Sequence, residues 1–249
     1  LGLILAIVVI SCIFGSLAAG RWETFLLFIN GASFGIKDPL FDLDVSFYAF
    51  TLPFLNWLQS LLLGTVIVIL VGSILVYFVN ALLSGTSFSL KRPIKAHLAI
   101  LGAILMLGLV WNHYLAIYEL VFSDSGAAFG AGYADVNARI PVLRILMAIA
   151  GASGVLMLIS IVVREPRSIR LAIGAFALWV MAALVVGNLY PSMIQRLTVN
   201  PDELSREKVY IERNIDFTRQ AFALDRITET TYPVRGEITK EIIDRNPGT

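Results

Sequence analysis

Five long runs of apolar residues, separated by polar stretches, dominate the first four fifths of the chain. A helix that crosses the hydrocarbon core of a bilayer needs about 20 such residues. Open sheet is excluded because unpaired backbone groups are too costly in hydrocarbon. The pattern therefore predicts an all-α, polytopic transmembrane helical bundle. Its five spans are expected at residues 1–20, 52–83, 96–118, 140–163 and 171–190.

Charged side chains are concentrated at the end of the chain. Residues 1–199 carry 11 basic and 8 acidic side chains, whereas residues 200–249 carry 8 basic and 10 acidic ones. The first region reads as a lipid-embedded bundle and the second as a polar segment in water. Fifty residues cannot build a convincing core alone. We therefore expect residues 200–249 to hold an amphipathic helix and the beginning of a larger extracytoplasmic region.

The overall composition supports a membrane protein and excludes several other classes. Apolar residues make up 57% of the chain and charged residues 15%, outside the range usual for a soluble domain. The formal net charge of +1 gives no case for nucleic acid binding, and no motif implies a cofactor. Cys12 is the one cysteine, so no disulfide forms within the chain. The chain begins inside an apolar run without Met, as expected for a piece of a longer protein.

Basic residues mark one side of the predicted bundle. Short loops rich in Lys and Arg stay cytoplasmic. Two such loops hold Lys91, Arg92 and Lys95, and Arg164, Arg167 and Arg170. The alternate loops, residues 21–51 and 119–139, are longer and richer in acid. This asymmetry predicts that the start of the chain lies near the cytoplasmic face and that residues 200–249 lie outside.

Three aspartates in the first long loop are weak candidates for a metal site. Asp38, Asp42 and Asp44 supply the carboxylate oxygens that hard cations prefer. No spaced ligand pattern of a calcium loop follows them, so turn formation and helix capping are the favoured interpretation. The glycines of residues 129–135 resemble a dinucleotide fingerprint only superficially, because no strand–helix unit surrounds them. We expect a packed turn there.

Few polar groups lie at membrane depth in the predicted spans. His97 is expected at the cytoplasmic interface, and His113 is expected to form a structural hydrogen bond to a neighbouring helix rather than a metal or proton site. Glu119 and Arg144 have similar estimated depths in adjacent spans. Pairing is the usual condition for charges near lipid, so these two residues are predicted to form an ion pair that joins the helices.

The polar region opens with a strong helix start. Asn200 is a predicted N-cap, Pro201 occupies the first helical position and Glu203 completes a capping box. A helix is therefore predicted from Pro201 to Phe222. Its buried face is expected to contain Leu204, Ile211, Ile215 and Phe222. Residues 226–232 resemble a short strand, and residues 239–245 the start of another helix.

Several blocks resemble a family of large bacterial membrane proteins, uncharacterised protein family 0182. They include the stretches at residues 30–39, 47–54 and 190–191, and the run from Pro201 to Arg219. The most specific is residues 129–139, with the letters FGAGY and DVNAR. The resemblance implies about seven N-terminal spans followed by a long extracytoplasmic region. It also implies a location in the bacterial plasma membrane, and it implies no activity, cofactor or catalytic residue.

Three functional classes remain open at this point. The leading hypothesis is a non-enzymatic protein whose helices, embedded in the lipid bilayer, anchor an extracytoplasmic domain or bind a membrane-protein partner. The second is a transport or lipid-handling component, which requires an internal polar cavity. The third is an enzyme at the outer interface, for which the candidate residues are Asp42, Asp44, Glu119, Asp135 and His113.

Overall fold

The computed structural model describes residues 2–84, 91–164, 166–228, 230–231 and 240–245. Nine α-helices lie within these ranges. They are α1 (Gly2–Ala19), α2 (Trp22–Ile29), α3 (Leu52–Leu83), α4 (Arg92–Glu119), α5 (Ile140–Ser160), α6 (Arg167–Leu184), α7 (Tyr190–Ile194), α8 (Glu203–Ala221) and α9 (Lys240–Asp244). The described residues contain no β-strand, only an isolated bridge between Lys37 and Asp44. The predicted all-α fold is confirmed.

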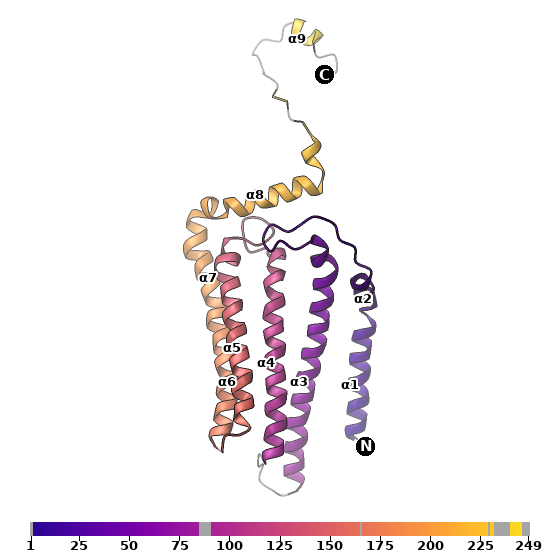
Figure 1. The fold of residues 1–249 in the computed structure, drawn as a ribbon, viewed down its shortest axis with the longest axis vertical. Coiled ribbons are helices and arrows are strands. Elements are labelled where there is room, and N and C mark those ends of the chain that lie inside the picture. The colour runs from indigo at the N-terminus through magenta and orange to yellow at the C-terminus, as the bar shows by residue number, and fades with distance from the viewer. Residues whose placement is uncertain (1, 85–90, 165, 229, 232–239, 246–249) are drawn as a thin grey trace.

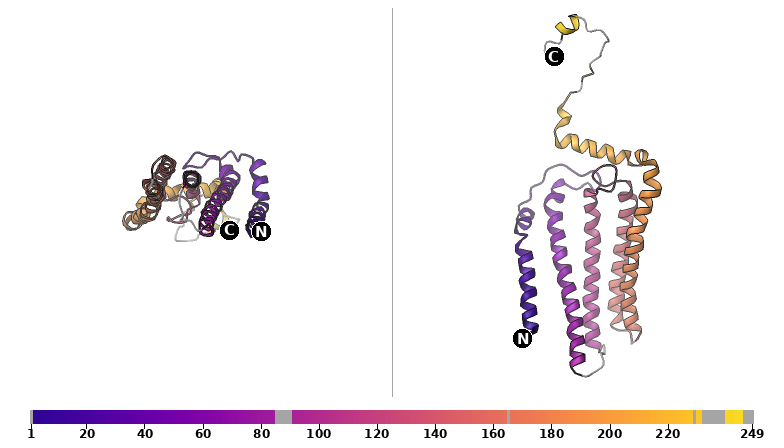
Figure 2. Two further views of the ribbon diagram at one scale, coloured as in Figure 1. Left: turned by 90° about the horizontal axis from the view of Figure 1, so that it is seen from below. Right: turned by 180° about the vertical axis from the view of Figure 1, so that it is seen from behind.

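The long helices stand side by side, and α8 crosses one end of them (Figure 1). We call this end of the bundle the α8 end. The loop between α2 and α3 and the loop between α4 and α5 also lie there, whereas the α5–α6 turn and the first residues of α4 lie at the opposite end (Figures 1 and 2). Four of the described helices are long and apolar enough to cross a membrane, and α1 with α2 adds a fifth if that bent pair is one span.

Four of the prolines near helix starts are preceded by a wide turn of π-helix. Such turns occupy Phe47–Thr51, Asp135–Arg139, Val185–Leu189 and Gln195–Val199. In every case a proline follows two residues later, at positions 53, 141, 191 and 201. A proline lacks the N–H group and its ring clashes with the carbonyl four residues earlier, which the wide turn accommodates. The helical backbone therefore begins well before residues 52 and 140, where the predicted spans start.

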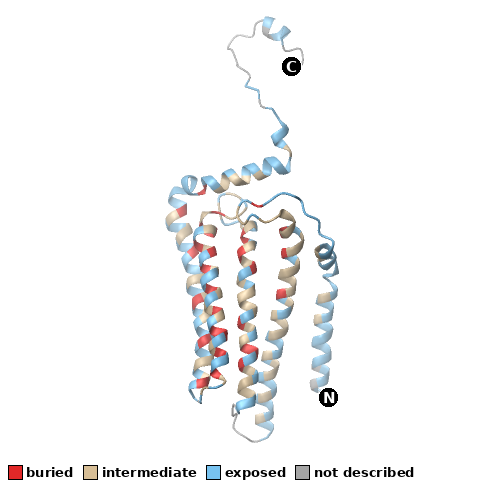
Figure 3. Ribbon diagram, viewed as in Figure 1, coloured by how far each residue is buried: buried red, intermediate tan, exposed pale blue. Residues whose placement is uncertain are grey.

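Small residues bring α4 and α5 together at the centre of the bundle. A methyl group on Gly102 would lie 2.8 Å from the Met157 sulfur, and one on Gly154 would lie 3.3 Å from Met106 Cβ. Met106 is completely buried. Ser153, also buried, donates to the Ala175 carbonyl of α6 at 2.8 Å. Figure 3 accordingly shows buried residues on α4, α5 and α6 along much of their length.

The first helix is a separate element with little covering. The described side chains of α1 are almost all exposed (Figure 3). Between Ile7–Ala19 and Trp22–Ile29 the chain bends by 46°. The short α2 attaches to α3 through aromatic contacts, with Phe28 stacked on Phe54 at a centroid distance of 4.2 Å. The apolar stretch after Arg21 thus forms a short helix against the α8 end of α3.

The predicted strand at residues 226–232 is wrong for the part of it that the structure describes. Leu224–Arg226 form a 3₁₀ turn, and Ile227, Thr228, Thr230 and Thr231 form no strand. The start of this turn, Ala223, has a left-handed backbone with φ of 53°. An isolated strand without a pairing neighbour has no ladder to stabilise it. The short helix expected at 239–245 is present as α9.

Candidate functional site

Asp44 organises the first loop at the α8 end. Its carboxylate accepts backbone N–H bonds from Phe34 at 3.1 Å, Gly35 at 3.0 Å and Ser46 at 2.8 Å, and a further bond from the Ser33 hydroxyl. The Ser33 and Ser46 hydrogen bonds hold the pKa of Asp44 well below its usual range. Asp44 is therefore an ionised group that closes a loop, the role that turn chemistry predicts.

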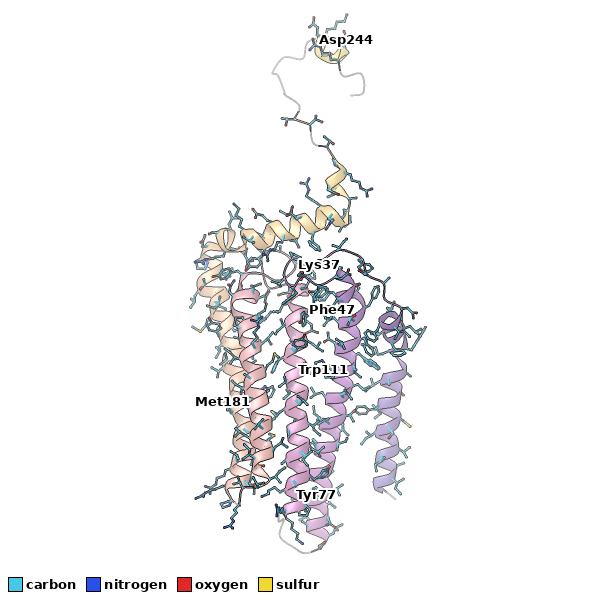
Figure 4. The ribbon with its side chains drawn as sticks, in the orientation of Figure 1. Lys37, Phe47, Tyr77, Trp111, Met181 and Asp244 are labelled. Carbon is cyan, nitrogen blue, oxygen red and sulfur yellow. The ribbon has the colours of Figure 1, made fainter. Side chains whose placement is uncertain are left out.

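Asp38 and Asp42 have different partners from Asp44. Asp38 is buried and accepts the Phe41 N–H at 2.6 Å and the Tyr48 hydroxyl at 3.1 Å, both on Oδ2. Asp42 has a left-handed backbone and forms an exposed ion pair with Lys37 at 2.8 Å. Figure 4 places Lys37 beneath α8. The three aspartates thus point to separate partners. Across the residues that the structure describes, no group of three or more His, Cys, Asp or Glu side chains could hold a metal ion.

Asp135 organises the second loop at the α8 end, which joins α4 to α5, as Asp44 organises the first. Its side chain is buried, and it accepts bonds from the Gly132 N–H at 3.2 Å and the Ser125 hydroxyl at 3.0 Å. Its other oxygen accepts a hydrogen bond from Arg139 Nη1 at 3.0 Å, and the two residues form an ion pair one helical turn apart. This loop contains Gly130, which has φ of +119°, a conformation that residues with a Cβ rarely adopt. The expected packed turn is therefore present, and a buried carboxylate holds it.

Glu207 joins α8 to this second loop. Its exposed fraction is 1%, and both carboxylate oxygens lie 3.1 Å from the Tyr133 amide nitrogen. A methyl group on Gly132 would lie 3.0 Å from each of these oxygens, so glycine is what permits the close approach. Burial raises the pKa of Glu207; the Tyr133 hydrogen bond opposes that effect, and the charges of Asp135 and Glu203 add to it.

Three further contacts continue along α8. Asn214 Nδ2 donates to the Phe129 carbonyl at 2.7 Å. The Tyr210 hydroxyl accepts a bond from Asn137 at 3.2 Å. Near the start of the helix, the Arg206 guanidinium lies 5.4 Å from the centre of the Tyr133 ring. Together with Glu207, these residues span a little over two turns in the first two thirds of α8, so the helix is attached at several points rather than at one.

A cavity of about 290 Å³ lies between α8 and the two loops. Its walls are mainly apolar and include Phe122, Phe129 and Phe217. Its polar members include Asp38 from the first loop and Glu207 and Arg213 from α8. Apolar walls with a few converging polar groups are typical of small-molecule sites. This cavity is the candidate functional site.

The predicted buried face of α8 is wrong in register. Leu204 is 78% exposed, Phe222 74% and Ile215 49%. The covered face instead carries Glu207, Tyr210, Asn214 and Phe217, with Ile211 partly buried beside it. The surface beneath α8 consists of two loops, which present backbone N–H and carbonyl groups to the helix beside the apolar cavity wall, rather than an apolar helix face. The helix therefore turns its hydrogen-bonding residues inward.

The start of α8 also differs from the prediction. Asn200 has helical dihedral angles and its side chain accepts a bond from Gln195 at 3.1 Å, so it does not cap a helix. The backbone arrives already helical from α7, through Gln195–Val199 and a 3₁₀ turn at Asn200–Asp202. It changes direction at Asp202, with φ of −140° and ψ of 50°, and Glu203 begins α8 without a side-chain cap.

The remaining predicted residues lie in separate places. Glu119 accepts a bond from Asn56 of α3 at 2.7 Å. Neither it nor Arg144 takes part in an ion pair among the described residues, so the predicted pair is wrong. His113 accepts a bond from Trp179 of α6 at 3.2 Å, the structural bond to a neighbouring helix that we expected. At the opposite end, His97 Nδ1 lies 2.8 Å from the hydroxyl of Tyr77, which Figure 4 labels.

The carboxylates proposed for an interfacial enzyme do not converge. Asp135 lines a polar cavity with Arg139 and Arg196, and Glu119 lines another with Arg139. Neither Asp42 nor Asp44 lines the cavity under α8. The residue that sequence reasoning missed is Glu207. Its position at helical spacing with Tyr210, Asn214 and Phe217 was the available signal, but a Glu among charged neighbours is normally read as solvated.

Long apolar helices and a polar, hydrogen-bonded cap define a polytopic helical protein compatible with a membrane. The chain belongs to the uncharacterised protein family UPF0182, whose family model matches residues 1–249. It is 36% identical to a UPF0182 protein of Frankia alni over 98% of this chain and 24% of that protein. It is 34% identical to a UPF0182 protein of Pelotomaculum thermopropionicum, over 99% of this chain and 27% of that protein. It is 33% identical to one of Salinibacter ruber, over 97% of this chain and 25% of that protein. The chain thus spans about a quarter of the length of these bacterial relatives. No solved structure matches it.

Proposed function

We propose that this chain is the membrane anchor of an envelope protein, in which α8 holds the region after it at a fixed place above the bundle. The observation that carries this proposal is the burial of Glu207 against the Tyr133 amide. A carboxylate is costly to bury unless it is hydrogen-bonded in a defined geometry. A loose linker helix would leave this group in water, so the contact indicates a docked helix.

The orientation in a bacterial plasma membrane is part of the same proposal. Basic residues at the end opposite α8, among them Lys91, Lys95 and Arg167, favour a cytoplasmic location for that end. The α8 end is then extracytoplasmic. Single cysteines at Ser84 and Ser205, in the full-length protein with Cys12 and every other cysteine replaced, test this in intact cells with a membrane-impermeant thiol reagent. Labelling at Ser205→Cys with protection at Ser84→Cys supports the orientation; the reverse contradicts it.

Hydrogen exchange tests the docking of α8. In the full-length protein in lipid nanodiscs, we expect slow exchange of the Tyr133 amide in the native protein. Glu207→Ala removes its acceptor, so that amide and α8 should both exchange faster. Glu212→Ala is the matched control, because Glu212 is an exposed glutamate on the same helix. Equal exchange in the native protein and both variants would contradict a docked helix.

Lipid handling is the second candidate function, because one specific observation favours it. The cavity under α8 combines aromatic walls with charged groups of both signs. Amphipathic molecules present the same combination. An enzyme at the outer interface has no comparable support, since the candidate carboxylates are divided among different cavities.

A further inference from the structure

The cavity under α8 has spare hydrogen-bond acceptors. Both hydrogen bonds of Asp38 are made to Oδ2, which leaves Oδ1 without a donor among the described residues. The two oxygens of Glu207 share the single Tyr133 N–H. A carboxylate offers about four lone-pair sites, so both groups can accept more bonds than the protein supplies. The two carboxylates come from segments far apart in sequence and line one cavity.

Arg213 gives the same cavity a donor of the opposite charge. Its guanidinium lies 5.6 Å from the centre of the Tyr210 ring and takes part in no ion pair among the described residues. It lines both this cavity and a more polar one that also contains Arg219. Arg213 therefore lies where the apolar cavity meets polar surroundings. A guanidinium with free donors is suited to a phosphate group.

We propose that this cavity binds a zwitterionic phospholipid of the phosphoethanolamine class. The ammonium group donates to the Asp38 carboxylate, whose Oδ1 has no donor among the described residues, and the phosphate accepts from Arg213. Glu207 adds a second negative charge to the same cavity wall. The first part of an acyl chain contacts Phe122, Phe129 and Phe217. A primary ammonium has three N–H donors for the spare acceptors, whereas a quaternary ammonium has none. An anionic headgroup without an amine would leave the buried carboxylates without a cation. This inference gives the lipid-handling candidate a site and a ligand, and the anchoring role does not depend on it.

Native mass spectrometry of the full-length protein in detergent tests the assignment. The probes are dioleoyl phosphatidylethanolamine, dioleoyl phosphatidylcholine and dioleoyl phosphatidylglycerol. We expect one molecule of phosphatidylethanolamine to bind at least tenfold more tightly than either of the others. Equal retention of phosphatidylethanolamine and phosphatidylcholine, within twofold, would overturn the proposal. Free O-phosphoethanolamine should not compete, because it lacks the chain; competition at the lipid's own concentration would also overturn it.

Two variants and a control separate a specific site from a structural effect. Arg213→Gln removes the phosphate donor and Asp38→Asn removes one carboxylate charge, so each should weaken phosphatidylethanolamine binding at least tenfold. Lys208→Gln removes an exposed cation of α8 that does not line the cavity, and should leave binding unchanged. Hydrogen exchange of α8 in Arg213→Gln should match the native protein, so loss of lipid and loss of docking are distinguishable. Native-like lipid binding by Arg213→Gln would overturn the assignment.

Discussion

The middle of the bundle and its α8 end are stabilised by opposite kinds of side chain. Between α4 and α5, small residues such as Gly102 and Gly154 admit buried methionines, and Ser153 adds one short hydrogen bond. At the α8 end, three buried carboxylates, Asp38, Asp135 and Glu207, gather backbone and hydroxyl donors from two loops. Close packing of complementary shapes stabilises the middle of the bundle, whereas hydrogen bonds to buried polar groups stabilise the α8 end.

The difference determines how each region responds to change. Packing against glycine is short-ranged and tolerates no added volume, so single substitutions in the bundle act locally and strongly. Asp38 and Asp135 collect several donors within their own loops, and Glu207 joins α8 to a loop more than 70 residues away, so loss of one carboxylate is expected to release a whole loop or helix. A single substitution at the α8 end is therefore expected to loosen an entire element, whereas one in the middle of the bundle acts locally.

The largest effect is expected for added volume in the α4–α5 contact. Gly154→Leu places a side chain against Met106 and the Ala103 carbonyl, and should lower the free energy of unfolding by about 3 kcal/mol. Gly174→Leu is the matched control, because apart from the nearby backbone of its own helix no atom lies within 4 Å of a methyl group at that position. Denaturant titration in detergent measures both. Similar losses in the two variants would show that shape does not govern this contact.

Loss of the α8 carboxylate should have an intermediate effect. Glu207→Ala leaves the Tyr133 N–H without its acceptor and should cost about 2 kcal/mol, the usual range for an unsatisfied buried donor. Glu212→Ala, on the exposed face, should cost less than about 0.5 kcal/mol. Thermal unfolding of the two variants side by side measures the difference. If Glu212→Ala lowers the stability as much as Glu207→Ala does, the polar contacts under α8 do not keep the helix in place.

A smaller effect is expected at the α5–α6 contact. Ser153→Ala removes the bond to the Ala175 carbonyl and should cost about 1 kcal/mol, as is typical for hydrogen bonds between membrane helices. Ser16→Ala, whose hydroxyl bonds only within α1, should be nearly neutral. The measurement is again the free energy of unfolding in detergent. A cost for Ser153→Ala well above that for Glu207→Ala would reverse the proposed comparison.

The first loop should show a pH dependence of a defined sign. Hydrogen bonds from Ser33 and Ser46 depress the pKa of Asp44 in the folded protein. A carboxylate with a depressed folded-state pKa contributes stability above its unfolded pKa of about 4, and that contribution is lost as the pH falls further. Hydrogen exchange of residues 33–46, corrected for intrinsic rates, should therefore show constant protection above about pH 4 and declining protection below it. Asp44→Asn should remove this dependence; its persistence in that variant would assign it to another group.

The bundle could be predicted from sequence because its determinants are local. Apolar runs of sufficient length specify helices, and His113 could be expected to bond a neighbouring helix because a lone polar group there needs a partner. Four prolines change the helix starts, since the wide turns before them depend on backbone sterics that an apolar pattern does not record. The membrane limits of each span stay a prediction.

The α8 end could not be predicted in the same way. The Asn200 cap was inferred from residue types, but the chain arrives at that point already helical, so no cap is needed. The predicted buried face of α8 rests on Leu204, Ile215 and Phe222, yet the loops that the helix meets present backbone groups that bind Glu207 and Asn214 instead. Which face a helix buries depends on the partner, and these partners are more than 70 residues away in the chain.

A distance measurement tests the central claim, that α8 is a fixed part of the bundle, most directly. Spin labels at Ser205 of α8 and Arg144 of α5, both exposed, are placed in the full-length protein with Cys12 and every other cysteine replaced. Pulsed electron resonance in nanodiscs should give one narrow distance distribution, which Glu207→Ala broadens and Glu212→Ala leaves unchanged. A broad distribution in the otherwise native protein would contradict the account, because α8 would then be a mobile connection rather than an anchor.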